Sequence, residues 1–125
     1  MNIYQENILE HNNNPRNYGY LEKPDVKAHD SNPLCGDSFD MEFKFKGERL
    51  IDISFHGHGC AISKASASML TEKVKKMKIG DMEKMVKDDV LKMIGIELSY
   101  ARLKCALLPL KILKLGLYKY IGKVP

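Results

Sequence analysis

The sequence predicts an α+β fold in which a three-stranded antiparallel sheet packs against helices. Two stretches, 39–46 and 50–55, alternate apolar and polar residues and are joined by Gly47-Glu48, as in paired strands with one buried face. A shorter candidate strand, 26–29, precedes them. Apolar residues recur at helical spacing over most of the chain after Gly59. The residues thus indicate an antiparallel meander with one buried face, followed by helices.

The elements follow in order along the chain. The first dozen residues are predicted to be helical up to Asn12-Asn13-Asn14-Pro15, and Arg16 to Pro24 reads as a loop. Val26 to His29 is the first strand. The second has Phe39, Met41, Phe43 and Phe45 on its buried face, and the third has Ile51, Ile53 and Phe55 there.

Four helices are predicted after the sheet. The first runs from about Ala61 to Lys78, and the second begins with Asp81 as its N-cap and ends near Val86. The third starts at Asp88 and ends at Gly95. The last runs from about Cys105 to Ile121, with Pro109 supporting that start. It is apolar nearly all round, so it is either deeply packed or used for self-association or partner docking.

Length and composition indicate one domain, residues 1–125, with 44% hydrophobic and 29% charged residues. The net charge is +4, but the lysines of 73–92 alternate with acidic residues, so we expect a solvated helix face and no nucleic-acid partner. The N-terminus lacks the order of a signal peptide, and no apolar run reaches the length of a membrane span. We therefore expect a cytoplasmic protein without a membrane partner.

Three cysteines, none in a Cys-x-x-Cys pair, are the main functional signal. Cys35, Cys60 and Cys105 lie in different segments, and Asp37 follows the first by two residues. Cysteines of a reducing compartment are more often metal-binding or reactive than disulfide-bonded. The alternative is three inert cysteines that fill the core. Three thiols and a carboxylate form a four-ligand set for a thiophilic metal or an iron–sulfur cluster.

The neighbours of these cysteines suggest sulfur chemistry. Gly36 lets Cys35 and Asp37 point to one place, although Asp37 is also a common turn former. Cys60 and Cys105 are predicted near helix N-termini, where the helix dipole favours the thiolate. Lys104 is either a cationic support for the Cys105 thiolate or a solvent-exposed lysine. An anionic Cys35 or Cys105 is expected to accept a sulfur atom as a persulfide and then donate it, and Cys60 is a third candidate acceptor.

Histidine is a second candidate ligand type. His56 and His58 precede Cys60 closely, and imidazole is a common zinc ligand. His56 continues the strand alternation and His58 is flanked by glycines, so turn and surface roles are the favoured interpretation for both.

The segments around the cysteines resemble a known family. They are similar to the three cysteine motifs of IscU/SufU-type iron–sulfur cluster assembly scaffolds, also called NifU N-terminal domain-like proteins. The matching segments are Asn32-Pro33-Leu34-Cys35-Gly36-Asp37, then Gly57 to Ser63 with Ala65 to Met69, and Arg102-Leu103-Lys104-Cys105-Ala106. The opening segment from Tyr4 to Asn17 is also similar to the start of that family, so the resemblance covers essentially the whole chain.

The resemblance implies a SufE/NifU-like α+β fold, with a three-stranded antiparallel sheet covered by helices, and a carrier rather than an enzyme. It implies that Cys35, Cys60, Cys105 and Asp37 hold a transient iron–sulfur cluster, with 2Fe-2S the favoured form. It also implies persulfide sulfur from a PLP-dependent cysteine desulfurase, and apo-proteins as recipients. Zinc is the alternative occupant of the same four positions.

The sequence departs from the family pattern in two places, and both bear on which branch of the family it resembles. Leu98-Ser99-Tyr100-Ala101-Arg102 stands where the classical scaffolds have a chaperone-binding segment, and Lys104 replaces a histidine, as in the SufU branch. Cys60 and Cys105 are only 45 positions apart, which leaves no room for the insertion usual in SufU. A cluster scaffold is therefore the leading prediction. The alternative is a zinc-bound sulfurtransferase that activates a desulfurase, and a purely structural zinc module ranks last.

Overall fold

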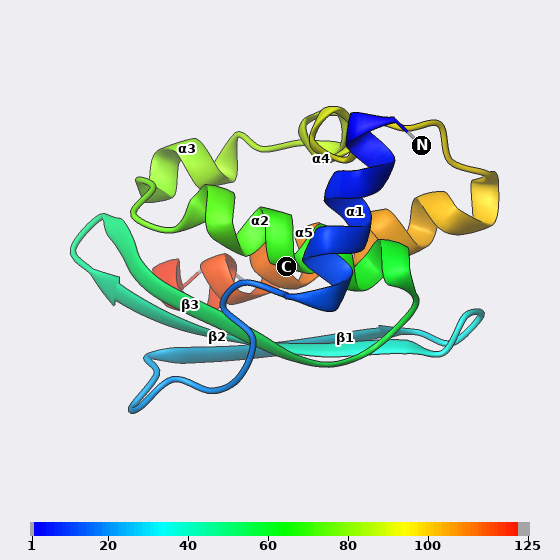
Figure 1. The fold of residues 1–125 in the computed structure, drawn as a ribbon. Helices are drawn as coiled ribbons and strands as arrows, with labels where there is room; N and C mark the ends of the chain where they lie inside the picture. Colours follow the sequence, from blue (N-terminus) through cyan, green and yellow to red (C-terminus); the bar gives the residue numbers. More distant parts are fainter. Residues whose placement is uncertain (1, 123–125) are drawn as a thin grey trace.

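The fold is described from a computed structural model, which defines residues 2–122. A three-stranded antiparallel sheet in the order β1-β2-β3 forms one layer, and the helices lie over one of its faces (Figure 1). The strands are β1 (Val26–Asn32), β2 (Asp37–Lys46) and β3 (Arg49–His58). This architecture is the one that the sequence predicted, although residues 1 and 123–125 of the expected domain lie outside the described part.

The alternating strands bury one face, as predicted. Phe39, Met41, Phe43 and Phe45 of β2 are all buried against the helices. The third strand differs from the prediction, because Ile51 is exposed and Leu50 takes the buried position. The pairing shifts between Lys44 and Phe45, so Phe45 faces Leu50 and Lys44 faces Asp52. Ile51 is thus left unpaired as a β-bulge, which reverses the side-chain alternation at that point.

Five helices complete the described chain: α1 (Ile3–Asn13), α2 (Ala61–Val74), α3 (Ile79–Glu83), α4 (Lys87–Ile94) and α5 (Tyr100–Ile121). Helix α5 packs on β1 and β2, α2 packs on β3, and α1 lies across α2 (Figure 1). Between α1 and β1 the chain follows the edge of β3, where the Phe55 amide donates to the Asn17 carbonyl at 2.9 Å. The core lies between the helical layer and the sheet.

Several helix boundaries differ from the prediction. Helix α2 ends at Val74 rather than Lys78, because residues 75–78 turn back and pair with the start of β3. Lys78 is the N-cap of α3, and Asp81 lies in its first turn. Helix α4 ends at Gly95 in the left-handed conformation, as predicted.

The last helix begins five residues earlier than predicted. Ser99 is its N-cap and accepts a hydrogen bond from the Arg102 amide, so Cys105 lies in the second turn and Pro109 lies inside the helix. Pro109 removes only the amide that would bond the Cys105 carbonyl. The buried apolar faces of α5 stabilise the helix across this position.

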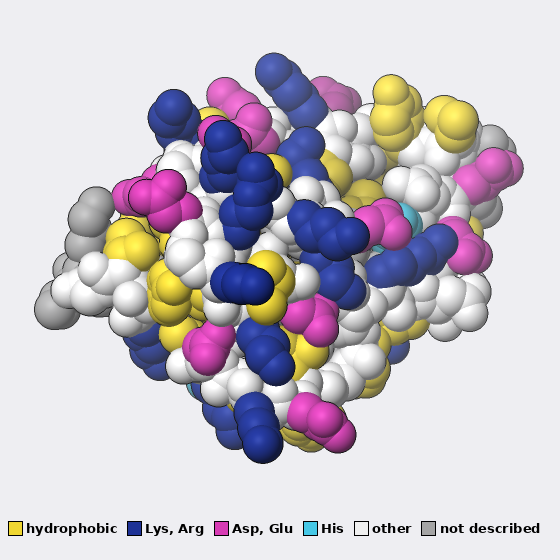
Figure 2. All heavy atoms as spheres, turned by 90° about the vertical axis from the view of Figure 1, so that its left-hand side faces the viewer, with side chains coloured by type: hydrophobic (Ala, Val, Ile, Leu, Met, Phe, Trp, Pro, Cys, Tyr) yellow, Lys and Arg dark blue, Asp and Glu magenta, His cyan; other side chains and the backbone are white. Residues whose placement is uncertain are grey.

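Figure 2 shows the end of the molecule that carries α3 and the β2–β3 turn. Lysine and arginine side chains lie there among aspartate and glutamate side chains (Figure 2). No helix within residues 2–122 is long and apolar enough to cross a bilayer.

Candidate metal centre

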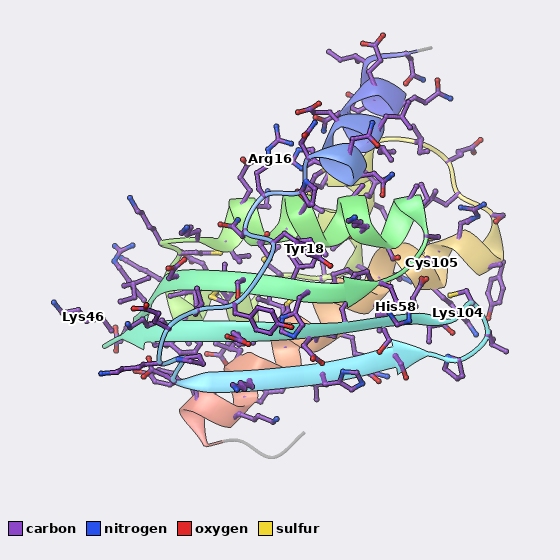
Figure 3. The ribbon with its side chains drawn as sticks, turned by 60° about the horizontal axis from the view of Figure 1, so that its bottom comes forward. Arg16, Tyr18, Lys46, His58, Lys104 and Cys105 are labelled. Carbon is purple, nitrogen blue, oxygen red and sulfur yellow. The ribbon has the colours of Figure 1, made fainter. Side chains whose placement is uncertain are left out.

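The three cysteines come together at one end of the sheet. Cys35 lies in the turn between β1 and β2, Cys60 is the N-cap of α2 directly after β3, and Cys105 lies in α5, which packs over this end (Figure 3). All three are free thiols. The segments that carry them are far apart in sequence and meet because α5 crosses β1 and β2.

The ligand atoms lie within a few ångströms of one another. Cys35 Sγ is 3.2 Å from Cys105 Sγ and 3.2 Å from Asp37 Oδ2. These three groups have ligand atoms within 4.8 Å of one another. Cys60 Sγ joins the set through the same carboxylate, at 3.9 Å from Asp37 Oδ2. The predicted four-residue set is therefore adjacent in space.

Asp37 is the shared contact of the set. It opens β2 and is 1% exposed, and its Oδ1 accepts the Cys60 amide at 2.9 Å. Burial alone raises the pKa of this carboxyl, but hydrogen bonds from the Cys60 amide and from the thiols of Cys35 and Cys105 outweigh it and lower the pKa. Asp37 is therefore an anion that faces the thiols, as a ligand must be.

Cys60 is oriented by the first turn of α2. Its extended backbone makes it the N-cap, and its Sγ accepts the Ser63 amide at 3.5 Å. The Ser63 hydroxyl donates to the Cys60 carbonyl at 3.1 Å and also contributes to lowering the pKa of Asp37. Sequence reasoning missed Ser63. The available signal was its place three residues after the cap, where side chains commonly return to the cap residue.

Gly59 is a second residue that the sequence analysis did not single out. A Cβ at this position would lie 2.9 Å from Asp37 Oδ1 and 2.8 Å from Cε2 of Phe39. Only a residue without a side chain lets Asp37 approach the start of α2 this closely. Gly36 has a different role, because its φ of 72° makes the turn that brings Cys35 beside Asp37.

Cys105 differs from the prediction. It is 2% exposed and lies in the second turn of α5, away from the helix N-terminus. Burial, together with hydrogen bonds shared with Cys35, Asp37 and Cys60, raises the pKa of this thiol well above its usual value. Without a metal Cys105 is thus a protonated thiol, whereas Cys35 is exposed. Metal binding at Cys105 must displace a proton.

Lys104 lies beside the Cys35 turn, and His56 and His58 lie on the face of the sheet opposite Asp37. Lys104 Nζ is 5.3 Å from the centre of the Tyr100 ring, and the residue lines a groove with Pro33 and Leu34 of the Cys35 turn. His58 pairs with Ser38, so it points to the face of the sheet opposite Asp37 (Figure 3). His56 also lies on that opposite face, where it contacts Asp40.

The donor set suits a thiophilic centre. Thiolate sulfur binds zinc and iron–sulfur clusters, and the one carboxylate is a harder and weaker ligand for them. The surroundings also fit, since a helix N-terminus and backbone amides face the site from α2. Such a set can hold a metal centre at the surface of the protein and release it.

The chain is similar to known proteins over nearly its whole length. The NifU-like N terminal domain family matches residues 3–125. The zinc-dependent sulfurtransferase SufU of Bacillus subtilis is 34% identical over 137 residues, with 96% of this chain and 92% of that protein covered. The iron–sulfur cluster assembly scaffold protein IscU 1 of Archaeoglobus fulgidus is 33% identical, with 97% and 78% covered.

Solved structures agree in fold. The putative iron–sulfur cluster assembly scaffold protein FiSufU of Fervidobacterium islandicum superposes with a TM-score of 0.78 at 26% identity, covering 90% of this chain and 94% of that one. The N-terminal part of a NifU-like protein from Brucella abortus superposes with a TM-score of 0.81 at 22% identity, covering 98% and 96%. The chain therefore belongs to the NifU-like N-terminal domain family, which includes the IscU and SufU proteins.

Proposed function

We infer that this chain is an iron–sulfur cluster assembly scaffold. It receives sulfur as persulfide from a cysteine desulfurase, combines it with iron into a 2Fe-2S cluster on Cys35, Asp37, Cys60 and Cys105, and passes the cluster to apo-proteins. The observation that carries this proposal is the contact of all three thiols with one buried carboxylate. The relation to IscU proteins over nearly the whole chain supports it.

Cys35 is the proposed sulfur acceptor. It is exposed in a turn beside Leu34, which is 82% exposed, whereas Cys105 is buried and protonated. The Cys35 thiolate attacks the outer sulfur of the desulfurase persulfide. A Cys35 persulfide forms, and the desulfurase cysteine leaves as a thiolate. Cys105 Sγ and Asp37 Oδ2, each 3.2 Å from Cys35 Sγ, are the adjacent ligands for the assembled cluster.

Lys104 is proposed to favour this transfer from the side of the Cys35 turn. It shares a groove with Pro33 and Leu34, so its charge stabilises an anionic sulfur at Cys35 rather than at Cys105. Lys104→Gln should slow persulfide transfer to Cys35, and Lys111→Gln is the matched control. Lys111 lines the same groove but forms an ion pair with Asp30 at 2.9 Å. Equal rates of persulfide transfer in the two variants would show that Lys104 has no role in the transfer.

Asp37 gives the proposed cluster its lability. Its oxygen is the only ligand of the set that is not sulfur, so its bond to iron is the weakest of the four. A carrier needs such a bond, because the recipient protein must replace the scaffold's ligands with its own. In this proposal the protein binds and hands on the cluster and is not itself an enzyme.

Anaerobic reconstitution tests the proposal. The protein is incubated with ferrous iron, cysteine and a desulfurase, and visible sulfur-to-iron charge-transfer absorption is recorded. We expect the absorption in the wild-type chain and its loss in Cys35→Ala, Cys60→Ala and Cys105→Ala. A colourless product that retains zinc would contradict cluster assembly.

A second function has support of its own, namely a zinc-dependent sulfurtransferase. The identity to the Bacillus subtilis SufU protein favours it, as does a three-sulfur, one-oxygen set of the kind that zinc accepts. Cys35, Asp37, Cys60 and Cys105 would hold the zinc, which would keep their thiols deprotonated. The SufU alignment spans 137 residues, more than the 125 of this chain, so SufU has residues without a counterpart here. Chelation of zinc without any change in desulfurase turnover would exclude this function.

A further inference from the structure

We propose a second metal site, for a divalent ion of the zinc, cobalt and nickel class, on the face of the sheet that the helices leave open. Its ligands are His29 of β1, Asp40 of β2 and His56 of β3. It shares no residue with the cysteine set and goes beyond the scaffold function.

The three ligands form one row across the sheet. His29 pairs with Asp40, and Asp40 pairs with His56, so their side chains project from the same face of three neighbouring strands. Asp37 lies three residues earlier on β2 and points to the opposite face. The two sites are therefore about 10 Å apart along the strand, on opposite sides of the sheet.

Both imidazoles contact the carboxylate of Asp40. His29 Nδ1 contacts Asp40 Oδ1, and His56 Nε2 is 3.0 Å from Asp40 Oδ2. Two ligands with bonds of about 2.0–2.1 Å to one zinc-like ion are separated by roughly 3 Å. The His56–Asp40 spacing thus suits two neighbouring ligands of one ion. Two histidines and one carboxylate are a common set for divalent transition metals.

The second nitrogen of His56 contacts the backbone. His56 Nδ1 is 3.1 Å from the carbonyl oxygen of Gly19, an acceptor, so Nδ1 carries the proton. Nε2 then points at Asp40 Oδ2, and either a proton or a metal ion bridges these two atoms. Hydrogen bonding of the remote nitrogen to a backbone carbonyl is also the usual way in which a metal-binding histidine is oriented.

His56 is held in this orientation before any ion arrives. The Tyr20 ring stacks on the imidazole with 4.0 Å between centroids, and the His56 side chain is only 17% exposed. The Gly19 carbonyl is held in place because the Gly19 amide donates a hydrogen bond to the Phe55 carbonyl oxygen at 2.8 Å. Fixed ligands lose little entropy on binding, which favours a specific site.

The site opens into a cavity of about 300 Å³ that Glu42 also lines. Glu42 is 4% exposed and adds a second carboxylate. Lys27 and Lys119 line the cavity as well, and the Lys119 ammonium is engaged with the Lys27 carbonyl at 2.8 Å. These two cations weaken the attraction for a metal ion, so we expect lower affinity here than at the cysteine set.

One ligand must move to complete the site. Within residues 2–122 only Cys35, Asp37 and Cys105 already have three ligand atoms within 4.8 Å of one another. The His29 side chain is 59% exposed, so its ring is free to turn toward the ion. Binding should therefore order His29, whereas His56 keeps its position.

The test is a cobalt titration of the full chain. In the wild-type protein, cobalt at the cysteine set gives near-ultraviolet thiolate-to-metal charge transfer, and cobalt at the proposed site gives only weak visible bands. A background with Cys35→Ser, Cys60→Ser and Cys105→Ser removes the first signal. Circular dichroism confirms that this background is folded.

The result expected is one cobalt ion per chain in the serine background. His56→Asn and His29→Asn should each lower its affinity at least tenfold. His58→Asn is the matched control, since it lies on the same strand and face but pairs with Ser38, and it should change the affinity less than twofold. In a chain that keeps its three cysteines, His56→Asn should leave the thiolate charge-transfer band unchanged.

Three results would overturn the proposal. The first is a folded serine background that binds no cobalt, which would mean that a proton rather than a metal lies between His56 and Asp40. The second is an equal loss of cobalt affinity in the His58→Asn and His56→Asn variants. The third is binding that survives both His29→Asn and His56→Asn. None of these results bears on cluster assembly by the cysteines.

Discussion

The substitution Gly59→Ala tests how closely the site is packed. The new Cβ would lie 2.9 Å from Asp37 Oδ1 and 2.8 Å from Phe39 Cε2, and it would also meet the Ser63 hydroxyl. Asp37 and Phe39 are 1% exposed and cannot move into solvent without loss of the core. Overpacking of this kind costs about 1–3 kcal/mol. In a domain of this size each kcal/mol lowers the melting temperature by roughly 2–8 °C.

The same clash should separate the ligands. Asp37 accepts the Cys60 amide directly, so a methyl group between them moves the carboxylate away from Cys60. We expect cobalt affinity at the cysteine set, measured by thiolate charge transfer, to fall at least tenfold. Gly80→Ala is the control, because its Cβ meets nothing within 4 Å and the residue lies in α3 without a positive φ. Equal melting temperatures and cobalt affinities in the two variants would refute the packing argument.

Three further predictions concern protonation and helix start. Burial, together with the charge of Arg16, lowers the pKa of His11 from 6.5, so the folded state favours the neutral ring. The contribution of neutral His11 to the free energy of unfolding should therefore be fully present above about pH 6.5 and be lost as the pH falls below it. His11→Gln should flatten that slope in thermal melts between about pH 7 and 5, and an unchanged slope would contradict it. Because the pKa of Cys105 is raised, cobalt uptake at the cysteine set must displace at least this proton, so the apparent cobalt affinity should rise by about tenfold or more per pH unit near neutrality. A pH-independent cobalt affinity would contradict this prediction. Ser99→Ala removes the N-cap of α5 and should cost about 1 kcal/mol in urea denaturation, whereas no loss would mean that the helix begins later.

The sheet was predictable from the sequence because its pattern has a period of two. The four apolar residues of β2 alternate without interruption, and all are buried. The bulge at Ile51 was not predictable, because Leu50-Ile51-Asp52-Ile53 contains apolar residues in both phases. Only the pairing with β2 decides which phase faces the core.

The start of α5 shows a different limit. Pro109 was read as favouring a start near Cys105, since proline disfavours a helix interior. The Ser99 cap and the buried faces of α5 outweigh one missing hydrogen bond, so the helix extends through the proline. Tertiary packing thus decided against a valid local preference.

For the site, the sequence indicated the ligand types but not their arrangement. Cys35, Asp37, Cys60 and Cys105 were recognisable from residue type and motif, and they are adjacent in space. The tightness of the site at Gly59 depends on contacts between segments, which no spacing reveals. The row of His29, Asp40 and His56 was hidden for the same reason, since register across three strands brings it together.

The central claim is that these three cysteines and Asp37 carry a transferable iron–sulfur cluster. Its most direct test is the metal and acid-labile sulfide content of protein purified without oxygen, together with that of the Cys105→Ser variant. We expect iron and sulfide in equal amounts, about two of each per cluster, released on addition of an apo-ferredoxin and absent from the variant. Zinc without sulfide, retained under the same conditions, would contradict it.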